Sequence, residues 1–200
     1  MNPINVFLRK SVAKAMLFII LLLPLLYLLL MGAGGGLGSD PAKFVVEYLA
    51  VVAFNLLLIT ISITPFKRLT GLSAILRFRR MLGLYVYFYV VLHIGSYLLF
   101  MADWGEFLSD LIKRPYIGVG FVAFLLLSAL AITSNAVSMR RLGRRWGLLH
   151  RAIYGVVILV LVHFVWQERA DYTASFAYLI VILALFVFRF ALSSVVRFFR

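Results

Sequence analysis

Residues 79–103 read RRMLGLYVYFYVVLHIGSYLLFMAD, with two arginines at one end and an aspartate at the other. Between them, positions 81–102 carry no Asp, Glu, Lys or Arg. A helix needs roughly 20 mainly apolar residues to cross the hydrocarbon core of a bilayer. This run therefore predicts a transmembrane helix whose two ends are marked by charge.

Five further stretches have the same length and character. The six predicted spans are 15–31, 44–66, 81–102, 116–137, 146–166 and 172–192. The chain is 64% hydrophobic with a mean hydropathy of +1.07, more apolar surface than one soluble core of this size can bury. We expect an all-α integral membrane protein, a six-helix bundle that forms one domain over residues 1–200, with short loops and no second soluble domain.

Basic residues gather between alternate spans, and their placement predicts the topology. If the N-terminus is cytoplasmic, 16 of the 20 Lys and Arg face the cytoplasm, and only Lys43, Lys113, Arg114 and Arg169 do not. All seven acidic residues fall in or beside the outer loops. This positive-inside pattern predicts that both termini are cytoplasmic. It also accounts for the net charge of +13 through membrane topology, without nucleic acid as a partner.

Two more features bound the chemistry. The chain has no cysteine, which excludes disulfides, thiolate metal sites, iron–sulfur clusters and c-type haem attachment. Residues 103–114 place Trp104, Phe107, Leu108, Leu111 and Ile112 at helical spacing. This pattern predicts a short helix lying in the outer membrane interface.

The three histidines all lie in predicted spans, where a metal-binding side chain is a functional candidate. His93 is 13 residues past Arg80, and His163 is 18 residues past Arg145. At 1.5 Å per residue, His163 therefore lies about 7–8 Å further out than His93. His150 lies about 20 Å below His163, near the cytoplasmic face.

These heights suggest haem. His93 and His163, on two parallel helices, are the better-matched pair to ligate one b-type haem iron across a porphyrin. His150 either ligates an inner haem or belongs to a quinone or flavin site. On an ideal helix His150 and His163 lie roughly 140° apart, so curvature or tilt is needed to turn both inward.

The histidines also fit simpler roles. An intramembrane histidine can simply hydrogen-bond a neighbouring helix. Acid–base catalysis has little support, because no carboxylate lies at membrane depth beside them. Around His93, the side chains of Tyr89, Ser96 and Tyr97 are placed either to line a macrocycle or to bond an imidazole.

Several motifs resemble those of the MsrQ-type (YedZ) family. They are Arg79-Arg80-Met81-Leu82-Gly83-Leu84, Leu92-His93, Ser96-Tyr97, Arg114-Pro115-Tyr116, Leu130-Ala131-Ile132-Thr133-Ser134, Arg141-Leu142-Gly143-Arg144-Arg145-Trp146, Leu149-His150-Arg151, Tyr154, His163-Phe164-Val165-Trp166 and Ile63-Thr64-Pro65. The resemblance covers nearly the whole chain and keeps all three histidines. One departure is that some relatives have histidine and glycine where this chain has Glu47 and Ala50.

The resemblance implies the haem-binding membrane subunit of a methionine-sulfoxide reductase system, within the ferric-reductase-like transmembrane group. Such a subunit sits in the bacterial inner membrane and takes electrons from quinol. It passes them through haem to a periplasmic molybdopterin-dependent subunit that repairs oxidised methionine in proteins. The resemblance also implies that the subunit binds FMN, which receives electrons from a cytoplasmic flavin reductase. The chain would then be the electron-transfer subunit, not the catalytic one.

Two rival interpretations remain. A stand-alone cytochrome b-like or ferric reductase needs a nicotinamide-binding domain, and none is expected here. A transporter or scaffold without cofactor is the other alternative, although transporters usually carry intramembrane acids.

The inner loop from Lys67 to Arg80 also has two candidate roles. Its cations either contact anionic membrane lipid, or Arg77, Arg79 or Arg80 grips the phosphate of FMN. A guanidinium group suits the second role because it can form two parallel hydrogen bonds to a phosphate.

Overall fold

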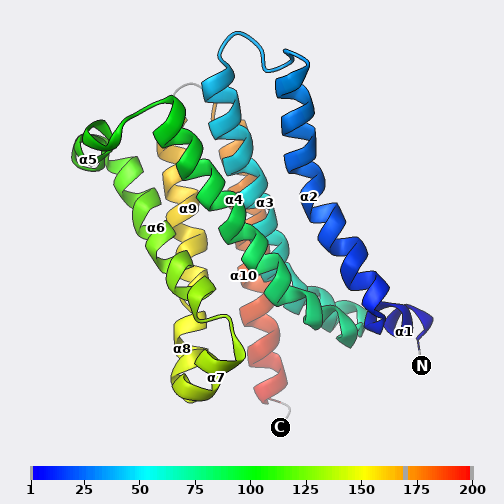
Figure 1. The fold of residues 1–200 in the computed structure, drawn as a ribbon. Helices are drawn as coiled ribbons and strands as arrows, with labels where there is room; N and C mark the ends of the chain where they lie inside the picture. Colours follow the sequence, from blue (N-terminus) through cyan, green and yellow to red (C-terminus); the bar gives the residue numbers. More distant parts are fainter. Residues whose placement is uncertain (1, 169–170, 199–200) are drawn as a thin grey trace. The chain divides into compact units, whose positions relative to one another are not determined.

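The computed structural model describes residues 2–168 and 171–198, with side chains described up to Arg189, and all its regular elements there are helices. In chain order they are α1 (Pro3–Arg9), α2 (Ser11–Ala33), α3 (Pro41–Thr70), the 3₁₀ helix η1 (Ser73–Phe78), α4 (Arg79–Phe100), α5 (Trp104–Lys113), α6 (Pro115–Ile132), α7 (Ala136–Leu142), α8 (Arg144–His150), α9 (Ile153–Gln167) and α10 (Thr173–Phe198) (Figure 1). Of the basic positions used for the topology, Arg169 and Arg200 lie outside the described residues, as does the side chain of Arg197.

Five segments of the described chain are long and apolar enough to cross a membrane. They are Ser11–Ala33, Pro41–Thr70, Ser73–Phe100, Pro115–Ile132 and Arg144–Gln167. The prediction of an all-α, multi-pass membrane protein is therefore confirmed. The sixth predicted span, 172–192, coincides with α10, whose described apolar part, Thr173–Arg189, is shorter. That crossing and the cytoplasmic termini stay predictions.

Some helix ends differ from the expected ones. Pro65, expected at a helix end, lies inside α3, which continues to Thr70. Membrane helices tolerate an internal proline because neighbouring groups satisfy the freed carbonyl. The span expected to reach residue 137 ends at Ile132, and the Asn135 side chain accepts a hydrogen bond from Ser138 N to cap the separate helix α7. Pro115 begins α6, where its missing N–H is not needed.

The chain divides into two compact units, residues 1–60 with 72–109 and residues 61–71 with 110–200, and each is described by itself. In the first unit three tyrosine hydroxyls donate to carbonyls of α2. Tyr85 bonds Phe18 O at 3.0 Å, and Tyr89 bonds Leu21 O at 2.7 Å. Tyr48 bonds Pro24 O at 3.1 Å. These bonds hold α3 and α4 against α2 and leave none of the three hydroxyls facing lipid.

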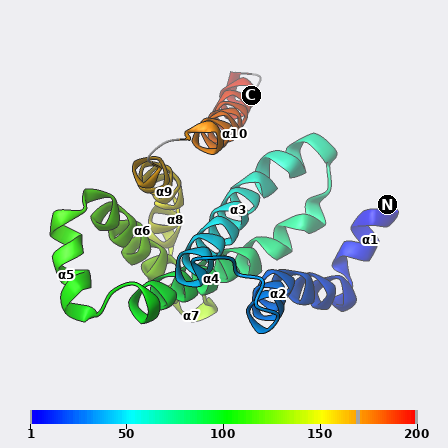
Figure 2. The same cartoon turned by 90° about the horizontal axis from the view of Figure 1, so that it is seen from above.

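In the second unit α6 and α9 pack side by side (Figures 1 and 2). Ala123 of α6 is buried, and Val156 and Val157 of α9 are completely buried. Aromatic edges join α9 to α10: Phe164 contacts Tyr178 at 5.2 Å between ring centroids. The α6–α9 contact positions one of the three histidines, His163.

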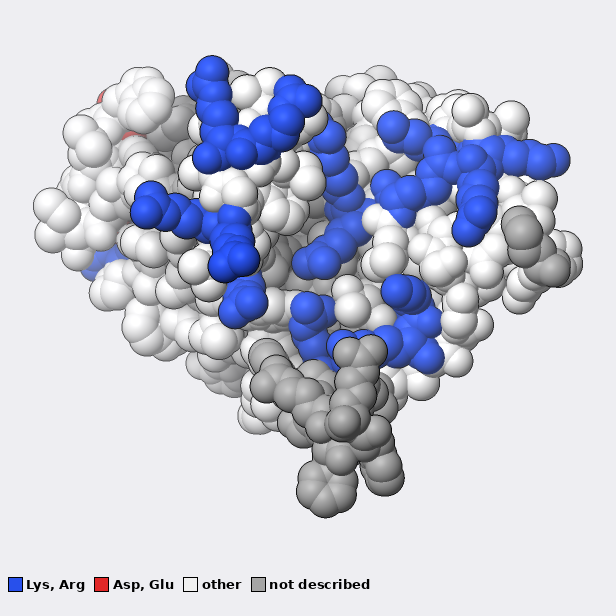
Figure 3. All heavy atoms as spheres, turned by 90° about the horizontal axis from the view of Figure 1, so that it is seen from below, with Lys and Arg blue, Asp and Glu red and all other residues white. Residues whose placement is uncertain are grey.

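Lys and Arg side chains gather on one face within each unit, and almost no acidic side chain appears there (Figure 3). In the first unit Arg77 donates to the carbonyls of Leu8 and Arg9, so its guanidinium ties η1 to α1. In the second unit α7 contributes Arg140 and Arg141, and α8 contributes Arg144 and Arg145. The arrangement is the one expected where a membrane protein meets the cytoplasm.

Helix α5 forms where the amphipathic pattern predicted it. Asp103 and Glu106 exchange side-chain-to-backbone hydrogen bonds of 2.8 and 3.2 Å, a capping box that starts the helix. Phe107 is buried against Tyr97. Of the other apolar residues in this pattern, Leu111 is half-buried and three are exposed, with Ile112 at 86%, Trp104 at 69% and Leu108 at 60%. An apolar stripe with a tryptophan is typical of a helix embedded in the membrane interface.

A nitroxide label tests this placement, because the chain has no native cysteine that would also react. On Ile112→Cys in lipid vesicles, we expect the label to collide with oxygen more than with a water-soluble nickel chelate, because it lies among acyl chains. On Lys113→Cys, an exposed position about 100° further round the helix, the preference reverses. Equal nickel accessibility at both positions, measured by power-saturation EPR, contradicts membrane embedding.

Candidate functional site

His93 lies within α4 and is half-buried. Its Nδ1 atom is 2.9 Å from the backbone carbonyl oxygen of Val46 in α3. Because a carbonyl oxygen can only accept, Nδ1 carries the proton and the lone pair of the neutral ring sits on Nε2. The hydrogen bond therefore fixes both the tautomer and the orientation of the imidazole.

His163, in α9 of the second unit, is held in the same way. Its Nδ1 atom is 2.6 Å from the carbonyl oxygen of Tyr116, in the first turn of α6. The Tyr116 ring lies beside it, with 6.0 Å between centroids. The lone pair again sits on Nε2. An imidazole whose Nδ1–H donates to a backbone carbonyl is a usual state of a metal-binding histidine, and the bond makes Nε2 a stronger ligand.

His150 has a different hydrogen-bond arrangement. Its Nε2 atom is 3.1 Å from the hydroxyl oxygen of Thr133. That hydroxyl donates its single proton to the Ala129 carbonyl at 2.7 Å, so it accepts from His150 and Nε2 is the donor. Trp146 stacks on the imidazole at 4.0 Å and donates from Nε1 to Thr133 O at 3.0 Å. Iron binding through Nε2 of His150 requires this hydrogen bond to break.

The span predicted at 146–166 corresponds to Arg144–Gln167, and its α-helical bonding is interrupted after His150. α8 ends at His150 and α9 begins at Ile153. Between them the bonds close over three residues instead of four: Arg151 N bonds Leu148 O at 3.1 Å, and Ala152 N bonds Leu149 O at 2.9 Å. A tighter turn rotates the chain further per residue than an α-helix. The ideal-helix angle of roughly 140° between the two imidazoles therefore does not apply.

The structure brings His150 and His163 into one unit and places His93 in the other. The pairing of His93 with His163 across a haem therefore stays a prediction. Around His93, the side chains expected to line a macrocycle have partners of their own. The Tyr89 hydroxyl bonds α2, the Ser96 hydroxyl donates to His93 O at 2.8 Å, and Tyr97 packs on Phe107.

The groups that orient the imidazoles could not be found from the sequence. The acceptors at Val46 and Tyr116 are backbone carbonyls, which carry no side-chain signature. Thr133 and Trp146 belong to the quoted motifs, but their spacing to His150 does not indicate a contact. The one signal is Gly143, whose φ of +50° suits a sharp turn that folds the segment after α7 back toward Thr133.

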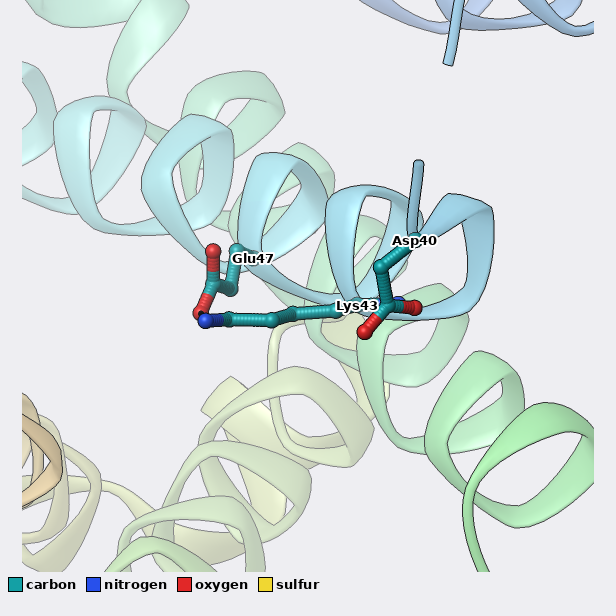
Figure 4. Close-up of polar contacts among 3 residues, drawn as sticks. All are labelled: Asp40, Lys43 and Glu47. Carbon is teal, nitrogen blue, oxygen red and sulfur yellow. Dashed lines mark hydrogen bonds and ion pairs between the residues drawn. The ribbon is translucent and has the colours of Figure 1, made fainter. Parts of the chain in front are cut away.

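The start of α3 carries the departure from some relatives at Glu47. Asp40 caps the helix by accepting from Lys43 N at 3.0 Å, and the Lys43 ammonium lies 3.8 Å from a Glu47 carboxylate oxygen (Figure 4). Both partners of this pair are about half exposed. An exposed i,i+4 pair contributes about 0.5 kcal/mol at most. The Asp40 cap starts α3, and Glu47 directly follows Val46, whose carbonyl accepts the His93 hydrogen bond.

The fold defines a multi-pass helical membrane protein in which two of the three histidines, His93 and His163, donate from Nδ1 to a backbone carbonyl of a neighbouring helix. Residues 46–161 match the family described as "Ferric reductase like transmembrane component", so the chain belongs to that family. The match begins at Val46, whose carbonyl accepts the His93 bond, and includes His93 and His150. It ends two residues before His163.

Two curated relatives carry the name "Protein-methionine-sulfoxide reductase heme-binding subunit MsrQ". The chain is 47% identical over 137 residues to the one from Xanthomonas axonopodis pv. citri, covering 68% of this chain and 63% of that protein. It is 45% identical over 142 residues to the one from Xanthomonas euvesicatoria pv. vesicatoria, covering 70% and 65%. The matched stretch thus spans less than two thirds of either relative. The resemblance found in the motifs is confirmed, and no solved structure matches the chain.

The two tautomers are directly measurable, because the chain contains three histidines and each gives one pair of ring resonances. In ¹⁵N-histidine-labelled protein produced without haem, we expect two rings protonated at Nδ1 and one at Nε2. Substituting each histidine with glutamine in turn assigns them, and His150 should be the Nε2-protonated ring. A His93 or His163 ring protonated at Nε2 alone contradicts the hydrogen bonds described above.

Proposed function

We propose that this chain is the haem-carrying, electron-delivering membrane subunit of a methionine-sulfoxide reductase system. The observation that carries the proposal is the shared geometry of His93 and His163. Each imidazole donates from Nδ1 to a helix carbonyl, at 2.9 and 2.6 Å, and so directs its lone pair to Nε2. A histidine that only joins two helices can donate from either ring nitrogen, and donation from Nδ1 at both positions places the lone pair of each ring on Nε2, as iron binding needs.

Both imidazoles fit the chemistry of a b-type haem. Neutral imidazole nitrogens are common axial ligands of haem iron, and two of them favour electron transfer by leaving no open position for a substrate. We assign His93 and His163 as the axial ligands of one haem. Haem, when bound, supplies one-electron redox chemistry. The chain supplies the ligands, their orientation and a surrounding of low polarity that excludes water.

His150 has a separate role in this proposal. Its Nε2–H donates to Thr133 and its ring is stacked by Trp146. We propose that it belongs to the cytoplasmic-side entry point for electrons, either as the ligand of a second haem or as part of a quinone or flavin site. Haem at His93 and His163 does not depend on that choice.

The electron donor and acceptor follow from the resemblance to MsrQ-type proteins. We propose quinol as a donor, with FMN and a cytoplasmic flavin reductase as an alternative entry, and a periplasmic molybdopterin-dependent methionine-sulfoxide reductase as the acceptor. Repair of oxidised protein methionine then occurs on that partner. For FMN, Arg77 is already bonded to α1, so we propose Arg79 and Arg80 as the phosphate ligands.

The proposed orientation in the bacterial inner membrane rests on charge. Sixteen of the 20 Lys and Arg fall on the cytoplasmic side of six crossings, and the seven acids fall on or near the other side. In this arrangement α10 is the sixth crossing, both termini are cytoplasmic, and the helices form one transmembrane domain. Anionic membrane lipid contacts the basic face of each unit.

Substitution of the ligands tests the function. His93→Ala and His163→Ala should each reduce bound haem at least as much as loss of an outer-sphere partner does, roughly 10–100-fold in affinity. His150→Ala is the matched control and should keep the haem held by the other two. Pyridine haemochrome assay per mole of purified chain measures the effect. Full haem content in either of the first two variants, or a colourless wild-type protein, contradicts the proposal.

A further inference from the structure

The imidazole of His163 occupies the space where a side chain at position 120 would stand. A Cβ atom built on Gly120 would lie 2.7 Å from Nδ1, 2.9 Å from Cε1 and 3.2 Å from Cγ of His163. Carbon atoms in van der Waals contact stay at about 3.5–4.0 Å. Any residue larger than glycine at this position therefore displaces the ring or the helix.

Helix geometry explains why this close approach falls on residue 120. In an α-helix a carbonyl oxygen faces the N–H group four residues later. The Tyr116 carbonyl consequently points along α6 toward Gly120. The His163 side chain, which reaches this carbonyl from α9, lies over residue 120. The 2.6 Å hydrogen bond from His163 and the absence of a side chain at Gly120 are two aspects of one contact.

The other histidine of the proposed pair provides an internal comparison. His93 bonds the Val46 carbonyl, and the residue four positions later in α3 is Ala50. Here a methyl group stands where glycine stands in α6. The Nδ1-to-oxygen distance is 2.9 Å at this position and 2.6 Å at Tyr116. The shorter bond thus occurs where the residue four positions after the acceptor has no side chain.

Most of the remaining helical glycines have no comparable neighbour. A Cβ added at Gly95, Gly147 or Gly155 would meet no heavy atom of a neighbouring group within 4 Å, and at Gly83 the nearest is at 4.0 Å. At Gly118 the nearest atom is a backbone oxygen, Leu111 O, at 3.1 Å. Among the helical glycines in the described part of the chain, Gly120 is the one against which an imidazole lies.

We infer that Gly120 is a positioning residue for His163. Its missing side chain lets the imidazole lie against α6 and donate Nδ1–H to Tyr116, which fixes the ring plane and strengthens Nε2 as a ligand. The position of the His163 ring against Gly120 does not depend on haem or on the proposed function. Only its consequence for haem rests on the proposed function.

The test compares Gly120→Ala with Gly155→Ala, a control that adds the same methyl group to a helix, α9, at a position with open space. Haem-free, ¹⁵N-histidine-labelled proteins are compared by NMR. Gly120→Ala should move or abolish the Nδ1–H resonance of His163 and leave the other two histidines unchanged. Gly155→Ala should leave all three unchanged. An unaltered His163 resonance in Gly120→Ala overturns the inference.

A reciprocal variant keeps the inference testable if Gly120→Ala does not fold. Ala50→Gly removes the methyl group four residues after Val46 and should shift the His93 Nδ1–H resonance downfield, as a shorter hydrogen bond does. No shift in a folded Ala50→Gly protein contradicts the inference that the residue four positions after the acceptor carbonyl controls how closely the imidazole approaches that carbonyl.

Haem binding supplies the second readout. Gly120→Ala should bind haem about 10-fold more weakly than Gly155→Ala, because it loses the outer-sphere bond of one ligand. A wild-type protein that binds no haem would defeat the proposed function, while the NMR comparison would still decide the role of Gly120. Equal haem affinity in the two variants, with the His163 resonance shifted, would show that the hydrogen bond does not strengthen the ligand and would overturn that part of the inference.

Discussion

An imidazole at membrane depth has one N–H that must find an acceptor, because lipid offers none. In this chain the acceptor for His93 and for His163 is a backbone carbonyl of an adjacent helix, at Val46 and Tyr116 respectively. These two bonds do several things at once. They satisfy a donor, join neighbouring helices, and determine which nitrogen carries the lone pair. The requirement that polar groups be satisfied inside the membrane therefore also sets the tautomer that the proposed haem ligation through Nε2 needs.

The same requirement shapes the rest of each unit. Tyrosine hydroxyls of the first unit donate to carbonyls of α2, and the Thr60 and Ser128 hydroxyls donate back to carbonyls of their own helices. Lys and Arg gather on one face of each unit, and α5 carries a capping box at its start and an exposed apolar stripe along its length. Directed bonds between helices and close helix packing, in place of a water-excluding core, are what a lipid solvent favours.

Five of the six predicted spans match segments long enough to cross a membrane, because hydrocarbon thickness sets a length that every crossing helix must meet. The predictions for residues 81–102 and for the helix near 103–114 depended only on runs of apolar residues and their spacing, and the structure agrees. The break after His150 could not be predicted, since neither proline nor glycine marks it. The role of Gly120 was equally hidden, because it depends on which carbonyl a histidine of another helix reaches. The sequence shows which hydrogen-bond donors and acceptors each side chain carries, but not which backbone carbonyls those side chains contact.

We propose that the two Nδ1-bonded imidazoles, His93 and His163, are the two axial ligands of one haem iron. The most direct measurement is low-temperature EPR of the purified, oxidised protein, combined with its haem stoichiometry. We expect a low-spin ferric signal of the bis-imidazole type with at least one haem per chain, and its loss in both single histidine variants. A high-spin five-coordinate signal, or a low-spin signal that survives removal of either His93 or His163, would contradict it.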